Sequence, residues 1–201
     1  MRNLAKTGLR MLSLLAVLPI LVFDFALRRL GNDGVFKSCC DILSLVPGRI
    51  GSYLRLAYLR VAAPNAHASG YIGFNSLFSQ RNTHLGRNIY IGPQCNIGSC
   101  RIGDDTLVAS GVHVMSGTGQ HQFDSVDTPI RDQGGKFVQV NIGSDCWIGN
   151  GAIVMADIGS HSVVGAGAVV TKALPPYSVA VGNPARVVRT RLDDTQDPGN
   201  A

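Results

Sequence analysis

Three residues that can exchange protons lie close together in this sequence, within residues 116–138 (SGTGQHQFDSVDTPIRDQGGKFV). They are His121, Asp124 and Asp127. A neutral imidazole, with a pKa of about 6.5, can accept a proton at neutral pH. A neighbouring carboxylate can hold such an imidazole in one tautomer. The stretch therefore suggests a general base, His121, oriented by Asp124 or Asp127, although both acids fit the role of solvated loop residues equally well.

The segments on both sides of residues 116–138 repeat with a period of six. Each repeat pairs a branched aliphatic residue with a glycine or another small or flexible residue. The pairs are Ile72-Gly73, Leu85-Gly86, Ile91-Gly92, Ile97-Gly98, Ile102-Gly103, Val108-Ala109, Val114-Met115, Ile142-Gly143, Ile148-Gly149, Ile158-Gly159 and Val164-Gly165. This period fits neither an amphipathic helix nor an alternating strand. It predicts a mainly β coil with three flat faces and about 18 residues per turn, whose aliphatic side chains point inward.

Composition agrees with a repeat coil. The 24 glycines follow no Gly-x-y period, which excludes collagen. Aromatic residues make up only 6% of the chain, as expected of a core too narrow for rings. Residues 116–138 interrupt the repeat, and a long excursion inside a compact repeat is usually either functional or disordered. The reactive side chains within it favour function.

The first 35 residues differ from the coil. Residues 11–23 (MLSLLAVLPILVF) carry no charge, and as a helix they would span about 20 Å, less than the roughly 30 Å of a bilayer's hydrocarbon core. Basic residues flank them: Arg2, Lys6, Arg10, Arg28 and Arg29. This pattern predicts a helix on the surface of an anionic membrane, with contact through residues 1–30. A cleaved signal peptide, a spanning helix and a helix packed on protein are the alternatives.

Charge is concentrated in the same part of the chain. The first 60 residues hold nine Lys/Arg and three Asp, a net charge of +6, whereas the whole chain carries +5, so the remainder carries about −1. No aromatic interleaving, zinc pattern or recognition motif accompanies the basic residues, so we expect no nucleic-acid partner.

Four segments follow from these patterns. Residues 1–35 form the N-terminal helix, and residues 36–66 form a helical cap over the open end of the coil. Residues 67–190 form the coil with its loop, and residues 191–201 form a frayed tail. Within the cap, the sequence predicts an apolar helix face made of Ile50, Leu54, Ala57, Tyr58 and Val61, with Arg55 and Arg60 off it.

Cysteine and histidine usage predicts no metal site and no disulfide. The cysteine count is odd, at five, and no C-x-x-C occurs, so we expect free thiols in a reducing compartment. Cys95 and Cys146 fit small apolar repeat positions. Histidines stacked from neighbouring turns could hold a metal, but His113 and His121 are eight residues apart and His161 fits an exposed position.

The repeats, their interruption, its histidine and the ending GAGAVVTK…LPPYSVAVGNPARVV together resemble the hexapeptide-repeat acyltransferases, over residues 70–190. The segments DTPIRDQGG, PGRIGSYLR and DCWIGNGAIV are most similar to the branch that O-acetylates saccharides in polysaccharide biosynthesis. Galactoside, maltose and xenobiotic acetyltransferases are relatives. The resemblance implies a left-handed parallel β-helix, a homotrimer with active sites between neighbouring subunits, and acetyl-CoA as the donor.

The resemblance also assigns roles to residues of this chain. It implies that His121 is the catalytic base, in preference to His113. Asp124, which the chemistry of the loop offers together with Asp127, is the candidate to orient it. Trp147 matches the family's tryptophan motif and is expected to help bind acetyl-CoA, and Asn150 and Ala166 match positions at its pantetheine arm. The positions near the nucleotide end of acetyl-CoA are Thr171, Lys172 and Arg186.

Three functions remain open from the sequence. The first is an O-acetyltransferase for a sugar hydroxyl group of a polysaccharide or its lipid-linked precursor, in the cytoplasm and peripheral to the inner face of the membrane. The second is an acetyltransferase for a small soluble acceptor such as serine, an amino sugar or a xenobiotic. The third is a non-transferase of the same fold, either a metal-dependent carbonic anhydrase or a trimeric scaffold.

Overall fold

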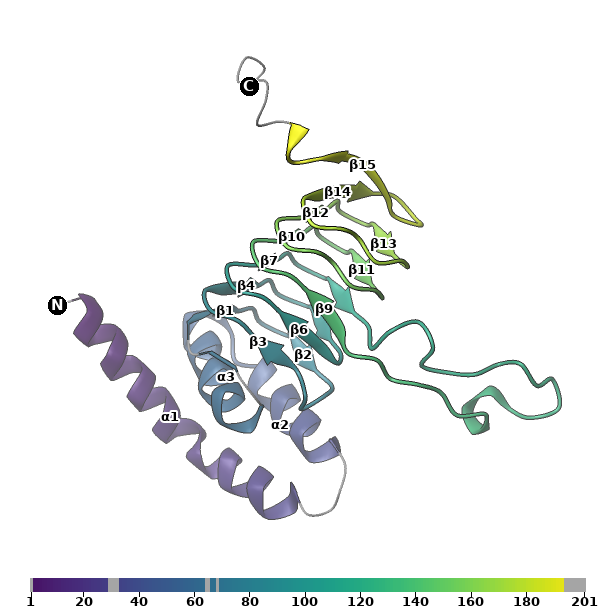
Figure 1. Ribbon diagram of the computed structural model, residues 1–201. Coiled ribbons are helices and arrows are strands. Elements are labelled where there is room, and N and C mark those ends of the chain that lie inside the picture. Colours follow the sequence, from purple (N-terminus) through teal and green to yellow (C-terminus); the bar gives the residue numbers. More distant parts are fainter. Residues whose placement is uncertain (1, 29–32, 64–65, 68, 194–201) are drawn as a thin grey trace.

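The computed structural model describes residues 2–28, 33–63, 66–67 and 69–193. Residues 29–32 of the predicted N-terminal segment and residues 194–201 of the predicted tail lie outside the described residues, as do the side chains of Arg2 and Lys6. The chain forms a three-sided parallel β-helix with three helices at its N-terminal end (Figure 1). The predicted mainly β coil is confirmed.

Each face of the coil is a parallel sheet, and successive turns of the chain supply neighbouring strands. The first sheet contains β1 (Gly70–Ile72), β4 (Ile89–Ile91), β7 (Leu107–Val108), β10 (Trp147–Ile148), β12 (Val163–Val164), β14 (Ser178–Val181) and β15 (Arg186–Thr190). The second contains β2 (Leu77–Phe78), β5 (Asn96–Ile97), β8 (His113–Val114), β11 (Ile153–Val154) and β13 (Val169–Val170). The third contains β3 (His84–Leu85), β6 (Cys100–Ile102) and β9 (Val140–Ile142). Single bridges extend it through Ile158 to Leu174, and β15 runs antiparallel to its neighbour β14.

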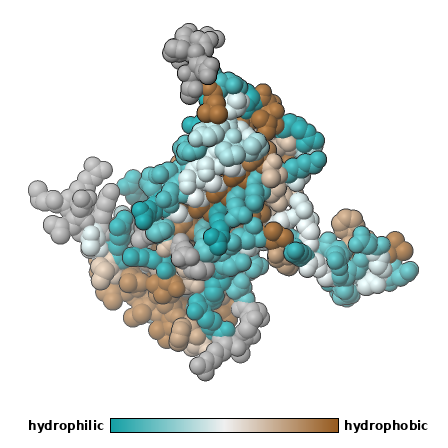
Figure 2. All heavy atoms as spheres, in the orientation of Figure 1, coloured by the Kyte–Doolittle hydropathy of each residue, from teal (hydrophilic) through white to brown (hydrophobic). Residues whose placement is uncertain are grey.

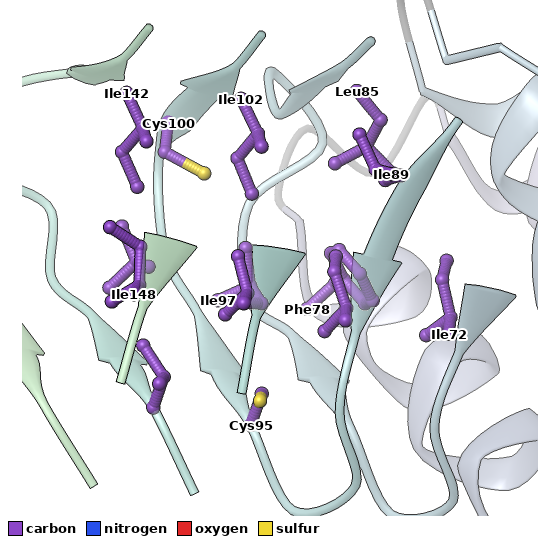
Figure 3. Packing of buried hydrophobic residues seen from close by; sticks show 14 of the residues in the cluster. Ile72, Phe78, Leu85, Ile89, Cys95, Ile97, Cys100, Ile102, Ile142 and Ile148 are labelled. Atoms are coloured by element: carbon purple, nitrogen blue, oxygen red, sulfur yellow. The ribbon is translucent and has the colours of Figure 1, made fainter. Parts of the chain in front are cut away.

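The core is a column of stacked aliphatic side chains inside the coil (Figure 3). The repeat residues Ile72, Ile91, Ile97 and Ile148 are fully buried. At the corners, successive turns approach so closely that a side chain does not fit, and a Cβ on Gly143 would lie 2.4 Å from the nitrogen of Ser160. The period of six therefore follows from alternating inward side chains and tight corners.

Two helices cover the N-terminal end of the coil. They are α2 (Gly34–Ser44) and α3 (Gly48–Ala62), which pack on β2 and β1. The expected apolar face of α3 is wrong in part, because Ile50 and Val61 are exposed whereas Arg55 is buried. The guanidinium of Arg55 donates to the carbonyl oxygens of Leu43, Val46 and Ile72. These charge-assisted bonds compensate for burying the cation and join both helices to the first strand.

The first helix, α1 (Arg2–Leu27), packs along α3 by one narrow stripe. The stripe consists of Ser13, Val17, Leu21 and Asp24, which are buried. Its other side is apolar and exposed, as the concentration of hydrophobic residues over the helices shows (Figure 2). Within the described residues, Thr7–Leu27 is a helix long and apolar enough to cross a membrane, by length and composition only.

Candidate active site

The interruption of the repeat forms a flap, residues 116–138, that leaves the coil between β8 and β9. It projects from the corner where the second and third sheets meet (Figure 1). Its two arms pair near the coil, since the amide of Lys136 donates to the carbonyl of Gly119 at 2.7 Å and that of Val138 to Ser116 at 2.9 Å. The flap is therefore anchored by regular backbone bonds rather than being a structureless loop.

The outer part of the flap is held by one side chain. The amide group of Gln133 accepts from the nitrogen of Ser125 and donates to the carbonyl oxygens of Ser125 and Thr128. A short 3₁₀ helix, η2 (Ile130–Asp132), precedes it. These bonds satisfy backbone groups that would otherwise depend on water, so the tip has a defined local shape.

His121 lies on the first of the two arms of the flap, just beyond the neck, which is the part next to the coil where the two arms pair. A Cβ on Gly135 would lie 1.9 Å from the carbonyl oxygen of Gln120 and 2.9 Å from the nitrogen of His121. The amide of Gln122 donates to the carbonyl of Gly134 at 3.0 Å. The backbone that carries the imidazole is therefore clamped between the two arms, and this close approach requires a glycine at position 135.

The side chains of His121, Asp124 and Asp127 are exposed. Within the described part of the chain, none of the three has a hydrogen bond or an ion pair. A single subunit thus places the predicted base and its candidate acids on one flap without bringing them into contact. Whether either acid orients His121 stays a prediction.

Thr171 and Lys172 lie on the same edge of the coil as the flap. Met115, just before the flap, donates its amide to Val154, and Met155 one turn further donates to Val170. Thr171 therefore stacks two turns beyond the base of the flap, about 10 Å along the coil axis at the usual strand spacing. Both Thr171 and Lys172 are exposed.

Three other predicted residues lie at the opposite edge of the second sheet, where it meets the first. They are Asn150, Ala166 and Arg186, all exposed. Asn150 and Ala166 are on successive turns, because the amide of Gly167 donates to the carbonyl of Asn150 at 2.8 Å. The amide of Ala185 donates to Val169, which places Arg186 at the next turn of this edge.

The outer surface of the second sheet joins the two edges. Its outward residues are in register across five strands: Leu77, Asn96, His113, Ile153 and Val169. Two of them, Asn96 and His113, are polar and exposed. Sequence analysis considered His113 but missed Asn96. The sequence could have pointed to Asn96, because it directly precedes a buried isoleucine and occupies the same repeat position as His113 one turn later.

Trp147 lies on a different face. It is an outward residue of the first sheet, in register with Leu107 and Val163, and its side chain is 55% exposed. One subunit therefore distributes the predicted site residues over the flap, two edges and one face of the prism. It does not gather them into one pocket.

A hollow of about 750 Å³ lies elsewhere, along the third sheet. Polar residues such as His84, Arg101 and Asn141 line it. None of the predicted site residues is among its lining residues. The edge that carries the flap separates this hollow from the outer surface of the second sheet. The volume of a hollow therefore does not by itself identify the site.

A second histidine has an ordered acidic partner. Nδ1 of His161 lies 3.0 Å from Asp145, which also accepts from Arg191 at 3.2 Å, and the ring stacks on Tyr177 at 4.8 Å. The hydrogen bond from His161 and the charge of Arg191 lower the pKa of Asp145 below its usual value. The pair lies at the corner of the third and first sheets, away from the flap, and is a rival candidate for the base.

Possible metal ligands and cysteines are two further sources of chemistry in a chain of this kind. No group of three His, Cys, Asp or Glu residues that could hold a metal occurs in the described residues. All five cysteines are free and buried. Burial raises the pKa of Cys100 to about 12 and also raises that of Cys146, so these thiols are poor sources of a nucleophilic thiolate.

Comparison with known proteins finds acetyltransferases among proteins of similar sequence or structure. No family model matches the chain. A probable acetyltransferase of Mycobacterium tuberculosis is 40% identical over 109 residues, which cover 53% of this chain but only 35% of that protein. The activity of that whole protein therefore does not transfer directly to this chain.

Solved structures support the fold over most of the chain. A maltose O-acetyltransferase from Clostridium difficile matches with a TM-score of 0.66 and 29% identity, covering 77% of this chain and 85% of that one. A galactoside acetyltransferase in complex with coenzyme A matches with a TM-score of 0.63 and 25% identity, covering 83% and 84%. The resemblance to the hexapeptide-repeat acetyltransferases is thus confirmed at the level of structure.

Proposed function

We propose that this chain, which has the fold of the hexapeptide-repeat acetyltransferases, moves an acetyl group from acetyl-CoA to a sugar hydroxyl group of a polysaccharide or lipid-linked saccharide. The observation that carries the proposal is a flap with a clamped histidine on the same coil edge as Thr171 and Lys172. A solved relative of similar size and fold has coenzyme A bound.

In the proposed mechanism His121 acts as the general base. The neutral imidazole takes the proton of the acceptor hydroxyl group while the oxygen attacks the thioester carbonyl carbon. A C–O bond forms, and the carbonyl electrons move to an oxyanion that a backbone N–H can stabilise. Collapse of this intermediate breaks the C–S bond, and the imidazolium of His121 returns its proton to the leaving thiolate. No covalent enzyme intermediate is needed.

The donor is expected to lie along the edges that flank the second sheet. Lys172 and Arg186 carry exposed positive charges suited to its phosphate groups. Asn150 and Ala166 lie on adjacent turns, where the small side chain of Ala166 leaves room for an extended pantetheine arm. Trp147 and Thr171 complete the proposed contacts.

The proposal includes a homotrimer whose active sites lie between subunits. Support comes from the flap, which exposes apolar side chains that its own chain does not cover: Val126 is 95% exposed and Phe123 72%. Ile130 and Phe137 are exposed as well. Apolar side chains gathered on a projecting segment are typical of a surface that another subunit buries. A neighbouring subunit could also unite Trp147 with the second-sheet surface.

We place the enzyme in the cytoplasm, peripheral to the inner face of the membrane through residues 1–30. The exposed apolar side of α1 supports this placement. A lipid-linked saccharide would then be presented beside the enzyme. A small soluble acceptor is the alternative, and the choice of acceptors in the experiment decides between them.

The test is release of free thiol from acetyl-CoA, measured with wild type, His121→Ala and His161→Ala, and with lipid-linked and free saccharides as acceptors. We expect His121→Ala to lower the rate about 10²- to 10⁴-fold, whereas His161→Ala keeps most activity. A control without acetyl-CoA corrects for the protein's own thiols.

Wild-type turnover by His121→Ala would falsify the assignment of the base. Loss of turnover only in His161→Ala would transfer the role to the His161–Asp145 pair. Faster turnover with serine, amino sugars or xenobiotics than with any saccharide would favour the soluble-acceptor alternative.

A further inference from the structure

The exposed side of α1 has the composition of a buried surface. Leu12, Leu15, Leu18, Val22 and Phe25 are all exposed, with Leu15 at 64% and Phe25 at 74%. The outer side of a helix on a soluble protein is ordinarily polar. An apolar surface of this extent marks contact with a membrane or another protein.

Charge at the border of this surface indicates which of the two it meets. Arg10 and Arg60 border a groove between α1 and α3 whose other lining residues include Met11 and Leu14. Arg28 borders a second groove, beside Leu18 and Phe25. All three arginines are exposed, and the nearby carboxyl group of Asp24 is buried. Apolar side chains edged by cations match the interface of a bilayer that contains anionic lipids.

The packing of α1 decides how it can meet a bilayer. Asp24, whose side chain is only 3% exposed, accepts from both terminal nitrogens of Arg81, at 2.8 and 2.5 Å. Arg81 belongs to the first turn of the coil, and its guanidinium also lies 4.8 Å from the ring centroid of Phe36. Burial opposes ionisation of Asp24, but the bonds and charge of Arg81 outweigh it and the pKa of Asp24 is lowered.

This buried ion pair conflicts with a helix that crosses the membrane. Withdrawing α1 from the domain would break the pair and place the charge of Asp24 in hydrocarbon without its partner, which is unfavourable. Docking with α1 parallel to the bilayer keeps the pair intact and buries only the exposed side. The length of the helix therefore does not imply that it spans.

We infer that the outer side of α1, with the neighbouring part of α3, is a docking surface on which the intact protein lies flat in the interface of an anionic lipid bilayer. This inference specifies how the membrane contact in the proposed function is made. It rests on the proposed function for that contact and for nothing else. It does not depend on catalysis, so His121→Ala should bind vesicles as wild type does.

Vesicle binding of the full-length protein tests the surface. Wild type should sediment with vesicles of phosphatidylcholine and phosphatidylglycerol, and added salt should weaken binding. Leu15→Glu and Phe25→Glu should each weaken it about tenfold or more. Val188→Glu, on an exposed position at the other end of the coil, is the matched control and should bind normally. Absence of sedimentation, or equal binding by all variants, would overturn the inference.

Depth of insertion tests the flat orientation. Tryptophan introduced by Leu12→Trp or Phe25→Trp can be quenched by brominated lipids, after subtraction of the emission of Trp147. Phe23→Trp gives a second pair with Leu12→Trp, because 11 residues make about three turns and place both positions on one exposed face of α1. In a flat helix these two positions lie at about the same shallow depth. In a spanning helix they would differ in depth by about 16 Å, and that result would refute the orientation. If vesicles do not bind and Leu15→Glu lowers the molecular mass in solution, the surface is instead a contact between copies.

Discussion

The coil and the flap place their apolar residues in opposite environments. In the coil, the repeat residues such as Ile97 and Ile148 are fully buried by neighbouring turns of the same chain. In the flap, Phe123 and Val126 are among the most exposed large apolar side chains that the structure describes. Both regions have ordered backbones, since the flap neck is paired and its tip is held by Gln133.

This difference indicates that the two regions are stabilised in different ways. The coil is stabilised by contacts between residues about one turn apart, so one chain suffices to form it. The flap has local backbone order but lacks a core, and its apolar side chains depend on a partner for burial. We therefore expect changes in the coil to affect folding, and changes in the flap to affect assembly and catalysis.

The largest expected effect is on the coil core. Ile148→Ala removes a fully buried side chain between two turns and should lower the free energy of unfolding by about 2–5 kcal/mol. Urea unfolding followed by circular dichroism measures it. The exposed Ile130→Ala in the flap is the control and should change the value by less than about 0.5 kcal/mol. Equal losses in both variants would mean that coil and flap form one cooperative core.

The next effect should appear in catalysis without loss of stability. Gly135→Ala forces the arms of the flap apart beside His121, because its Cβ would overlap the carbonyl oxygen of Gln120. A shift of about 1 Å in a catalytic group can lower turnover by up to about 10²-fold. Gly119→Ala is the matched control, since no atom lies within 4 Å of its Cβ. Acetyl transfer and urea unfolding should be measured on both; equal activity would show that the clamp does not position the base.

A smaller effect is expected on assembly. Phe123→Ser and Val126→Ser remove apolar area that the proposed trimer buries, and each should raise the dissociation constant about tenfold. Analytical ultracentrifugation over a concentration series measures this change. Leu12→Ser, on the exposed side of α1, serves as the control because it alters a similar exposed area outside the flap. An unchanged association constant in the flap variants would exclude the flap from the interface.

The coil was predictable from sequence because its contacts repeat at a fixed interval. Each buried aliphatic residue is followed by a glycine where two turns approach closely, as at Ile142 and Gly143, so the structure produces a visible sequence pattern. The flap was predictable as a break in that pattern. Its internal bonds were not, because the amide group of Gln133 binds backbone atoms and such contacts leave no periodic pattern.

The other contacts that were not predicted from the sequence join residues far apart in the chain. Asp24 and Arg81 are 57 residues apart, and no local rule pairs them. Arg55 was expected off the packed face of α3 because it is charged, whereas carbonyl oxygens at helix and strand ends compensate for its burial. The pairing of His161 with Asp145 was within reach, since the two residues are 16 apart and so about one turn apart in a coil of this kind.

The smallest effect expected is a pH dependence at this outlying His161–Asp145 pair. Because the folded pKa of Asp145 is lowered, the charged carboxylate stabilises the fold above the unfolded value of 3.8 and stops doing so as pH falls through the folded value. Asp145→Asn keeps a residue that tolerates the positive φ of 52° at this position. It should cost about 0.2–1 kcal/mol at neutral pH, because the pair is largely exposed and screened.

Urea midpoints of wild type and Asp145→Asn at pH 6 and pH 3 measure this effect. The gap between the two proteins should be present at pH 6 and should shrink at pH 3, which lies below the unfolded pKa of 3.8, because the stabilisation from the charge is lost as pH falls toward the lowered folded pKa. High salt at pH 6 should narrow the gap in the same way. A gap that persists undiminished at pH 3 would show that Asp145 acts through its backbone conformation and not through its charge.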